Sequence, residues 1–306
     1  MALGTVWTRL LDAYAYSATT AGDGSVYVAG GTESNLDGHT NNGGLDACIS
    51  KYNSDGTKAW TRLLGGSGRD FASSTSTAND GSIYVAGYAD SNLDGQTISR
   101  DTDAFLSKYN SDGTKAWTRL LGGPGADEAF TAATASDGSI YIAGRTTSNL
   151  DGHTSSGEFD VFISKYNSDG TKAWTRLLGG SGSDEAFSAA TASDGSIYVT
   201  GYTNSNLDGQ TNSGEFDVFI SKYNSDGTKV WTKLLGGSSN DRANSVTTAS
   251  DDSIYVAGYT TSDLNGQTNS GRSASFISKY NSDVATDTTP PTLQSTTASS
   301  NQLILT

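Results

Sequence analysis

The chain has 306 residues, 34% of them hydrophobic, and a formal net charge of −14. This length accommodates one large all-β domain as readily as two ordinary domains. The acidic balance disfavours nucleic acid and anionic membrane surfaces as partners, because no basic stripe is available for phosphates, and it is compatible with cations.

The chain begins at Met1 without the charged and apolar regions of a signal peptide. We therefore expect any export signal to lie outside this chain. No apolar run approaches the roughly 20 residues that a membrane-spanning helix needs. Membrane insertion is not expected.

Tryptophan marks a sequence repeat that runs through most of the chain. Four tryptophans recur every 57 residues, and a fifth precedes them by a slightly shorter interval: Trp7, Trp60, Trp117, Trp174 and Trp231. The first unit is shortened because Leu11 runs directly into Asp12, without the Gly-Gly-Ser-Gly that follows Leu64. Five tryptophans indicate five units.

One unit predicts four short strands that are separated by turn residues. In the unit from Asp184 to Leu235 the predicted strands are Glu185–Ala192, Ser196–Thr203, Asp217–Tyr223 and Thr228–Leu235. Asp226-Gly227 connects the last two, and Asp-Gly between two such runs is a hairpin signal because Gly accepts the positive φ of the turn.

Five units of four strands predict a five-bladed β-propeller over residues 1–283, with four antiparallel strands in each blade. The chain begins with a fourth-strand sequence, Thr5–Leu11, and the last unit stops after its third strand, Ser275–Tyr280. We expect the N-terminal strand to complete the last blade, which would close the ring without an open edge.

The repeat ends after Asp283, and residues 284–306 are expected to be a linker and the truncated start of a following β-module. The run Asp287–Leu293 resembles the start of bacterial immunoglobulin-like modules. We infer that the chain is a fragment of a larger multidomain protein.

The segments Ser196–Thr203 and Asp217–Tyr223, with Gly179-Gly180 before the next blade, resemble the bacterial SBBP-type β-propeller repeat. The resemblance covers residues 5–283. It implies a large secreted or surface-exposed bacterial protein and brings no catalytic mechanism. The family name implies seven blades, so the expectation of five rests on the tryptophan count.

In a propeller, the loops after the second and fourth strands of each blade share one face, and here that face collects carboxylates. Three aspartate positions recur: Asp37, Asp94, Asp151 and Asp208; Asp46, Asp103, Asp160 and Asp217; and Asp70, Asp127, Asp184 and Asp241. No Lys or Arg recurs throughout these loops. We expect calcium as the cofactor, because it takes roughly 6–8 oxygen ligands that such loops supply. The alternative is that these residues cap turns and solvate the surface.

Catalysis needs non-equivalent groups in different environments, whereas near-identical blades offer the same group five times. No catalytic residue is therefore predicted. We expect a monomeric binding or scaffolding module that binds calcium, with a glycan or another protein as a further partner. A lectin-like glycan-binding propeller is the alternative, since equivalent weak sites would gain avidity.

Aromatic side chains have two expected roles. The tryptophans are expected to pack between blades. Residues that differ between blades are the candidates for a ligand face, and we expect them in loops: Tyr14, Tyr16, Phe71, Phe130 and Phe187.

Overall fold

The computed structural model describes residues 6–282, which form five antiparallel sheets, here called blades 1 to 5. Blade 1 contains β1 (Tyr14–Thr20), β2 (Val26–Thr32), β3 (Asp46–Tyr52) and β4 (Lys58–Leu64). Blade 2 contains β5 (Asp70–Thr77), β6 (Ile83–Ala89), β7 (Asp103–Tyr109) and β8 (Lys115–Leu121). Blade 3 contains β9 (Asp127–Thr134), β10 (Ile140–Thr146), β11 (Asp160–Tyr166) and β12 (Lys172–Leu178). Blade 4 contains β13 (Asp184–Thr191), β14 (Ile197–Thr203), β15 (Asp217–Tyr223) and β16 (Lys229–Leu235). Blade 5 contains β17 (Asp241–Thr248), β18 (Ile254–Thr260) and β19 (Ala274–Tyr280).

The prediction of an all-β fold built from repeated four-stranded antiparallel sheets is confirmed for blades 1 to 4. In blade 4 the predicted strand boundaries agree with the structure to within one residue. The agreement follows from the turn chemistry, because Asp and Gly punctuate each unit at fixed positions.

The hairpin between the third and fourth strands shows this chemistry. In blade 1, Gly56 has a φ of 80° and its N–H donates to the carbonyl of Asn53 at 2.8 Å. Asp55 Oδ1 accepts the backbone N–H of Thr57 at 2.8 Å. Glycine is favoured at this last residue of the three-residue loop, because a residue with a side chain is strained at a left-handed φ.

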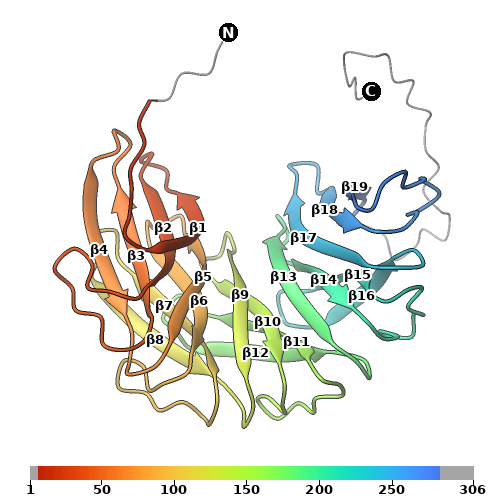
Figure 1. Cartoon of the computed structure of the whole chain (residues 1–306), viewed down its shortest axis with the longest axis horizontal. Helices are drawn as coiled ribbons and strands as arrows, with labels where there is room; N and C mark the ends of the chain where they lie inside the picture. The colour runs from red at the N-terminus through yellow and green to blue at the C-terminus, as the bar shows by residue number, and fades with distance from the viewer. Residues whose placement is uncertain (1–5, 283–306) are drawn as a thin grey trace.

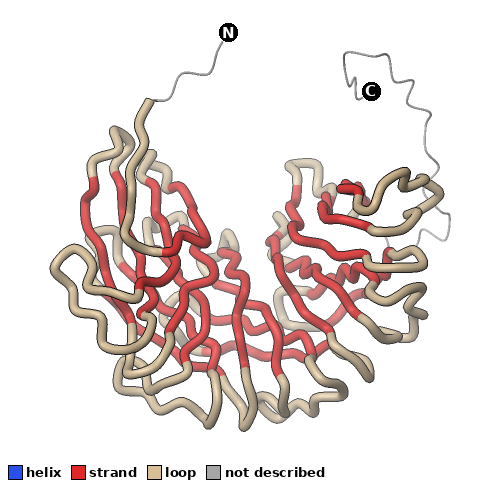
Figure 2. The backbone as a smooth tube through the Cα atoms, viewed as in Figure 1, coloured by secondary structure: helices blue, strands red, loops and turns tan. Residues whose placement is uncertain are grey.

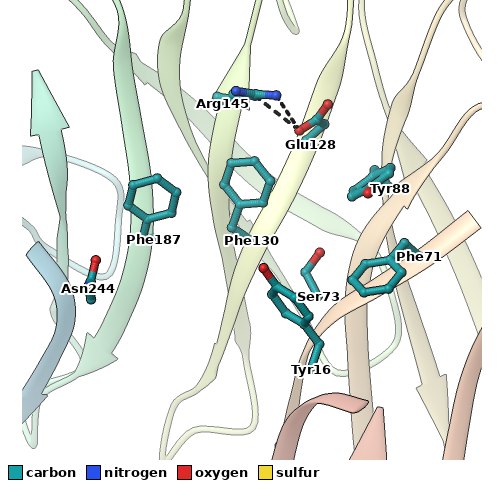
Figure 3. A pocket seen from close by; sticks show the side chains of 9 residues that line it. All are labelled: Tyr16, Phe71, Ser73, Tyr88, Glu128, Phe130, Arg145, Phe187 and Asn244. Atoms are coloured by element: carbon teal, nitrogen blue, oxygen red, sulfur yellow. Dashed lines mark hydrogen bonds and ion pairs between the residues drawn. The ribbon is translucent and has the colours of Figure 1, made fainter. Parts of the chain in front are cut away.

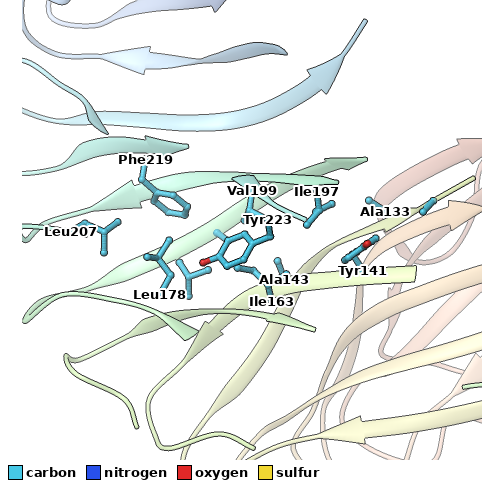
Figure 4. Packing of buried hydrophobic residues seen from close by; sticks show 13 residues of the cluster. Ala133, Tyr141, Ala143, Ile163, Leu178, Ile197, Val199, Leu207, Phe219 and Tyr223 are labelled. Carbon is cyan, nitrogen blue, oxygen red and sulfur yellow. The ribbon is translucent and has the colours of Figure 1, made fainter. Parts of the chain in front are cut away.

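The hydrophobic core lies between neighbouring blades. Figure 4 shows one cluster, in which Tyr141 and Ile163 of blade 3 lie close to Val199 and Tyr223 of blade 4. The middle strands of the central blades are therefore buried on both faces, as in β14. This explains why their sequences are apolar runs without strict alternation.

The tryptophans pack between blades, as predicted. The ring of Trp60 lies 5.8 Å from that of Tyr27 within blade 1, and its Nε1 donates to the carbonyl oxygen of Ser111 in blade 2 at 3.2 Å. Each fourth strand thus joins its own blade to the hairpin turn of the next.

The five blades follow one another along an open arc (Figures 1 and 2). The first strands β1, β5, β9, β13 and β17 are successive neighbours and line its concave side. Blades 1 and 5 stand at the two ends of the arc, and among residues 6–282 each has a neighbouring blade on one side only. Tyr16 on β1 is 73% exposed and Ile277 on β19 is 72% exposed.

Within the described residues, 6–11 belong to no strand, whereas the sequence predicts a strand over Thr5–Leu11. A strand needs a hydrogen-bonded neighbour, and β19, its predicted partner, lies at the other end of the arc. Trp7 nevertheless donates to Ser54 O at 3.2 Å, in blade 1, just as Trp60 does to the equivalent serine of blade 2. Ring closure stays a prediction.

The predicted C-terminal linker and β-module, residues 284–306, lie outside the described residues. Among residues 6–282, no helix has the length and apolar character needed to cross a membrane.

Candidate functional site

The first acidic series lies in the loop between the second and third strands of each blade. Asp37 has a φ of 50°, between Leu36 and His39, which exchange backbone hydrogen bonds of 3.0 and 2.9 Å. Its carboxylate contacts Lys58 Nζ at 2.6 Å and accepts the hydroxyl of Thr61 at 2.5 Å. The bonds from Lys58 and Thr61 hold the pKa of Asp37 below its usual range.

The same ion pair recurs in the next three blades: Lys115–Asp94, Lys172–Asp151 and Lys229–Asp208. The expectation that no basic residue recurs beside the acidic loops is therefore wrong for this series. The lysine was missed because it lies on the fourth strand, 21 residues after the aspartate, and not in a loop. These four carboxylates already have a cationic partner.

The three acidic series do not converge on a common centre. Across residues 6–282, no group of three or more His, Cys, Asp or Glu side chains is placed to hold a metal ion. Asp208 pairs with Lys229. Asp184 lies at the junction of blade 4 with blade 3, and Asp217 lies at its junction with blade 5.

The second and third series meet at the junctions between blades. Asp46 begins β3 of blade 1 and Asp70 begins β5 of blade 2, and both have an exposed fraction of 0%. The N–H of Asp70 donates to the carbonyl of Leu45 at 2.6 Å, which brings the two residues together. Asp46 Oδ2 accepts the N–H of Asn42 at 3.0 Å, and Asp70 Oδ2 accepts that of Gly66 at 2.7 Å. The Oδ1 atoms of both residues have no hydrogen-bond partner in the described part of the chain.

We call each such couple a junction pair, and one is present at each of the four junctions. The pairs are Asp46 with Asp70, Asp103 with Asp127, Asp160 with Asp184, and Asp217 with Asp241. Among the described residues, only Asp160 has a partner for its Oδ1, the hydroxyl of Ser156 at 3.4 Å. The other seven Oδ1 atoms are buried without one.

A Gly-Gly dipeptide contacts both carboxylates of each pair. A Cβ at Gly65 would lie 2.2 Å from Asp46 Oδ1, so that the carboxylate occupies the space of a side chain there. The next residue, Gly66, donates its N–H to Asp70. The dipeptide recurs because only glycine permits this close approach.

Burial dominates the electrostatics of the junction pairs. Burial, with a smaller contribution from the neighbouring charge of Asp46, raises the pKa of Asp70 to about 7. Burial likewise raises the pKa of Asp127 and of Asp184 to about 6, with Asp103 and Asp160 as the respective like-charged neighbours. Carboxylates perturbed in this way are typical of functional sites, although structural networks also produce them.

The concave face is the second candidate site. Hydroxyl groups link its strands, since Thr77 Oγ1 donates to Thr20 O and Thr134 Oγ1 to Thr77 O, each at 2.9 Å. Thr191 and Thr248 continue the same series at 2.9 Å. This ladder gives the face a regular frame.

A pocket of about 660 Å³ lies on this face (Figure 3). Its lining residues come from all five blades: Tyr16, Phe71, Ser73, Tyr88, Glu128, Phe130, Arg145, Phe187 and Asn244. The rings of Phe130 and Phe187 stack at 5.8 Å, and those of Tyr16 and Phe71 meet edge to face at 5.2 Å. The pocket is therefore aromatic, with a few polar groups among the rings.

The charges on and beside this pocket balance one another. Arg145 pairs with Glu128 at 2.9 Å and with Glu185 at 3.2 Å. Arg242 lies over the rings of Tyr202 and Phe216, with its Cζ 4.2 and 4.4 Å from their centroids. Arg145 is thus paired with two carboxylates, whereas Arg242 is covered by two aromatic rings.

Four of the five aromatic residues predicted for a ligand face line this pocket, Tyr14 does not, and the ligand face itself stays a prediction. Tyr16, Phe71, Phe130 and Phe187 line the pocket, but they lie on strands β1, β5, β9 and β13 and not in loops. Glu128 and Arg145 were missed. Comparison of equivalent positions would have found them, because Phe71 is replaced by Glu128 in the next unit, and Tyr88 by Arg145.

The SBBP β-propeller repeat family matches residues 116–151, 173–208 and 230–265. The chain thus contains β-propeller repeats. A β-propeller domain of unknown function, DUF5122, overlaps the SBBP repeats at residues 135–172 and 192–229. The immunoglobulin-like resemblance of the tail has no counterpart in these two matches.

The chain is 29% identical over 266 residues to regulatory protein FlaEY of Caulobacter vibrioides. The match covers 76% of this chain and only 28% of that relative. Among solved structures, a protein of unknown function from Bacteroides caccae aligns with a TM-score of 0.38 and 11% identity, over 75% of this chain and 70% of that one. A glucose dehydrogenase aligns with a TM-score of 0.37 and 10% identity, over 84% of this chain and 95% of that one.

Proposed function

We propose that the chain is a non-catalytic binding and scaffolding module, in which calcium stiffens the frame and the concave face takes the ligand. One observation carries the binding role. Near-identical blades differ at the concave position of Tyr16, where Ser73, Phe130, Phe187 and Asn244 stand in the other blades. Repeated residues maintain the frame, and diversified residues on one face distinguish a ligand.

The chemistry of this face favours a neutral glycan. Aromatic rings offer apolar faces for the C–H side of a sugar ring, and Glu128, Arg145 and Asn244 offer hydrogen bonds to hydroxyls. Arg145 already pairs with Glu128 and Glu185, so its charge is not free to bind an anionic ligand. This supports the lectin-like alternative over recognition of an anion.

A glycan array of neutral oligosaccharides, followed by calorimetric titration of the best ligand, tests this proposal. We expect Phe187→Ala to weaken binding at least tenfold, because it removes a ring that lines the pocket and stacks on Phe130. Val230→Ala is the matched control, since Val230 is an exposed apolar residue on β16, outside the pocket.

The proposal fails if no neutral glycan binds. It also fails if Val230→Ala weakens binding as much as Phe187→Ala does, because the bound face would then lie elsewhere. Circular dichroism of both variants would verify that each retains the β-fold.

We further propose that the N-terminal segment completes blade 5 and closes the ring. The sequence supports this through a matched loss of charge. In blades 1 to 4 an aspartate of the Asp37 type pairs with a lysine of the fourth strand. In blade 5 the aspartate is replaced by Asn265, and the N-terminal segment has Thr5 at the lysine position. The loss of both charges is expected if Thr5 and Asn265 belong to one blade.

We propose that the module belongs to a larger bacterial protein that is secreted or exposed at the cell surface. The SBBP repeats support this, and the chain corresponds to only 28% of the length of its relative FlaEY. Protease shaving of intact source cells, followed by detection with an antibody against this module, would test the location.

A further inference from the structure

Each junction pair contains buried carboxylate oxygens, and in seven of the eight aspartates the Oδ1 atom has no hydrogen-bond partner in the described part of the chain. Asp103 is 2% exposed and Asp127 0%. Each Oδ2 accepts one backbone N–H, from Ser99 at 3.0 Å and from Gly123 at 2.7 Å. Their Oδ1 atoms have no partner in the described part of the chain. A buried charged oxygen without a donor or counter-ion is strongly unfavourable.

Basic side chains do not provide the missing charge at this junction. Lys115, the lysine of the same blade, pairs with Asp94 instead. Burial raises the pKa of Asp127, with a smaller contribution from the neighbouring carboxylates; the Thr146 hydroxyl and the Gly123 N–H oppose the rise, and no Lys or Arg of the described chain joins them. The two like charges therefore need a cation from solution in order to remain ionised together.

The repeats contain an internal comparison. In blade 1, Ala13 stands at the position of the first-strand junction aspartate, and in blade 5, Ala274 stands at that of the third-strand aspartate. These two positions would face each other at a junction between blades 5 and 1. Both aspartates are thus missing from the same junction, and so is the Gly-Gly dipeptide, since Leu11 is followed by Asp12. If the two aspartates only capped separate turns, the replacement of one would not require the replacement of the other.

Backbone carbonyl oxygens lie in the same loops as the carboxylates, and one of them, Gly68 O, also accepts the N–H of Gly44 at 2.7 Å. Next to the pair of Asp46 and Asp70, a Cβ on Gly43 would lie 2.3 Å from Gly68 O and 2.7 Å from Gly66 O. The loop that contains Gly66 and Gly68 therefore directs these two carbonyl groups toward Gly43, in the loop on the other side of the junction. Carboxylate and carbonyl oxygens in a flexible arrangement are the ligands that calcium prefers.

We propose that each of the four junctions binds one calcium ion between the two carboxylates of its pair. Each ion would then join the third strand of one blade to the first strand of the next. This inference rests on the calcium binding of the proposed function and assigns its ligands. It makes the ion a cross-link between blades, and it leaves the Asp37 series out of the sites.

The test is a calorimetric titration of the chelator-treated full chain with calcium, together with thermal melts. We expect about four ions per chain, and about three for Asp127→Asn, with a smaller rise of the melting temperature in calcium. Asn keeps an oxygen that can accept the N–H of Gly123. In chelator this variant should melt at the same temperature as the wild type or higher, because it removes a buried charge, and this readout shows that it has folded.

Asp94→Asn is the matched control, because it removes one carboxylate of the Lys-paired series from the same loop region. It should leave the number of bound ions unchanged. An unchanged number in Asp127→Asn, or a loss in Asp94→Asn, overturns the assignment of the sites while calcium binding itself stands. No binding to the wild type at millimolar calcium overturns both. Glycan binding measured in chelator tests the concave face separately.

Discussion

The indole ring of Trp60 in blade 1 covers Gly113 in the hairpin turn of blade 2, where a Cβ would lie 2.7 Å from the ring. The same relationship recurs at the other described turns, for Trp7 with Gly56, Trp117 with Gly170 and Trp174 with Gly227. The turn glycine therefore serves two purposes, since it adopts a left-handed φ and also leaves room for the tryptophan of the preceding fourth strand.

Removal of one of these rings should destabilise the whole arc. We expect Trp174→Ala to lower the free energy of unfolding by about 3–5 kcal/mol, the usual loss for a large aromatic side chain in a core. Trp174 also contacts Tyr141, at 5.7 Å between ring centroids, so the change leaves a cavity on both sides of the junction. Denaturant unfolding measures this loss. A value below about 1 kcal/mol would show that the ring adds little to the junction.

The two roles of the turn glycine can be separated by a pair of variants. Gly227 and Gly209 have φ values of 83° and 78°, but only Gly227 has a ring within contact distance of its Cβ position. Gly209→Ala should cost about 1–2 kcal/mol for the left-handed backbone alone. Gly227→Ala should cost clearly more, because the methyl group also displaces Trp174. Equal losses in denaturant unfolding would contradict the contact.

The junction pairs predict how stability depends on pH when divalent cations are removed. The pKa of Asp70 rises from its ordinary value of 3.8 to about 7 in the folded chain, mainly through burial. Between these two values the folded state keeps a proton that the unfolded state has lost. The free energy of unfolding contributed by this group is therefore fully present below about pH 4 and is lost as the pH rises through about 7.

We accordingly expect the chelator-treated protein to melt at a higher temperature at pH 5 than at pH 8. Asp70→Asn should flatten this dependence. Asp37→Asn removes the same charge from a group whose pKa is lowered by Lys58, so it controls for the net charge and should leave the slope unchanged. A melting temperature that rises from pH 5 to pH 8 in chelator would contradict the prediction.

Ring closure predicts a specific cross-link. In blade 4, Ser221 pairs with Thr232 across the third and fourth strands, and their hydroxyl oxygens are 2.8 Å apart. The equivalent residues at the seam are Ser278 and Thr8. The double variant Thr8→Cys, Ser278→Cys should therefore form a disulfide within one chain under oxidising conditions. Non-reducing electrophoresis with peptide mapping would detect it.

The native cysteine should not interfere with this experiment, and a matched control is available. Cys48 is buried, and burial raises the pKa of its thiol to about 12, so it should not compete. Thr8→Cys with Ile277→Cys is the control, because neighbouring residues on β19 point to opposite faces. Disulfide-linked dimers in place of a monomer would indicate that the ends of the arc join different copies.

The sequence by itself determined the strands of the five sheets, their turns and the number of blades, but not the state of the predicted N-terminal strand. Its signals are local and repeated, because Asp-Gly turns and alternating or apolar runs depend on a few neighbouring residues. The position of Trp174 within its strand was enough to predict packing between blades, since a large aromatic ring beside Leu and Thr is stable only when covered. Because the units are near-identical in sequence, each is expected to form the same arrangement of strands.

Only the tertiary structure decided which carboxylates meet. Asp184 and Asp208 recur in the same unit and are equivalent as sequence, yet Asp208 pairs with Lys229 and Asp184 joins Asp160 of the preceding blade. Contacts between blades depend on the angle and spacing of whole sheets, and a sequence repeat contains no information about which copy faces which. The concave pocket has the same origin, because it combines one to three side chains from each of five sheets. Burial, which raises the pKa of Asp184 and leaves Asp208 paired in solvent, is likewise a property of the assembled arc and not of the repeat.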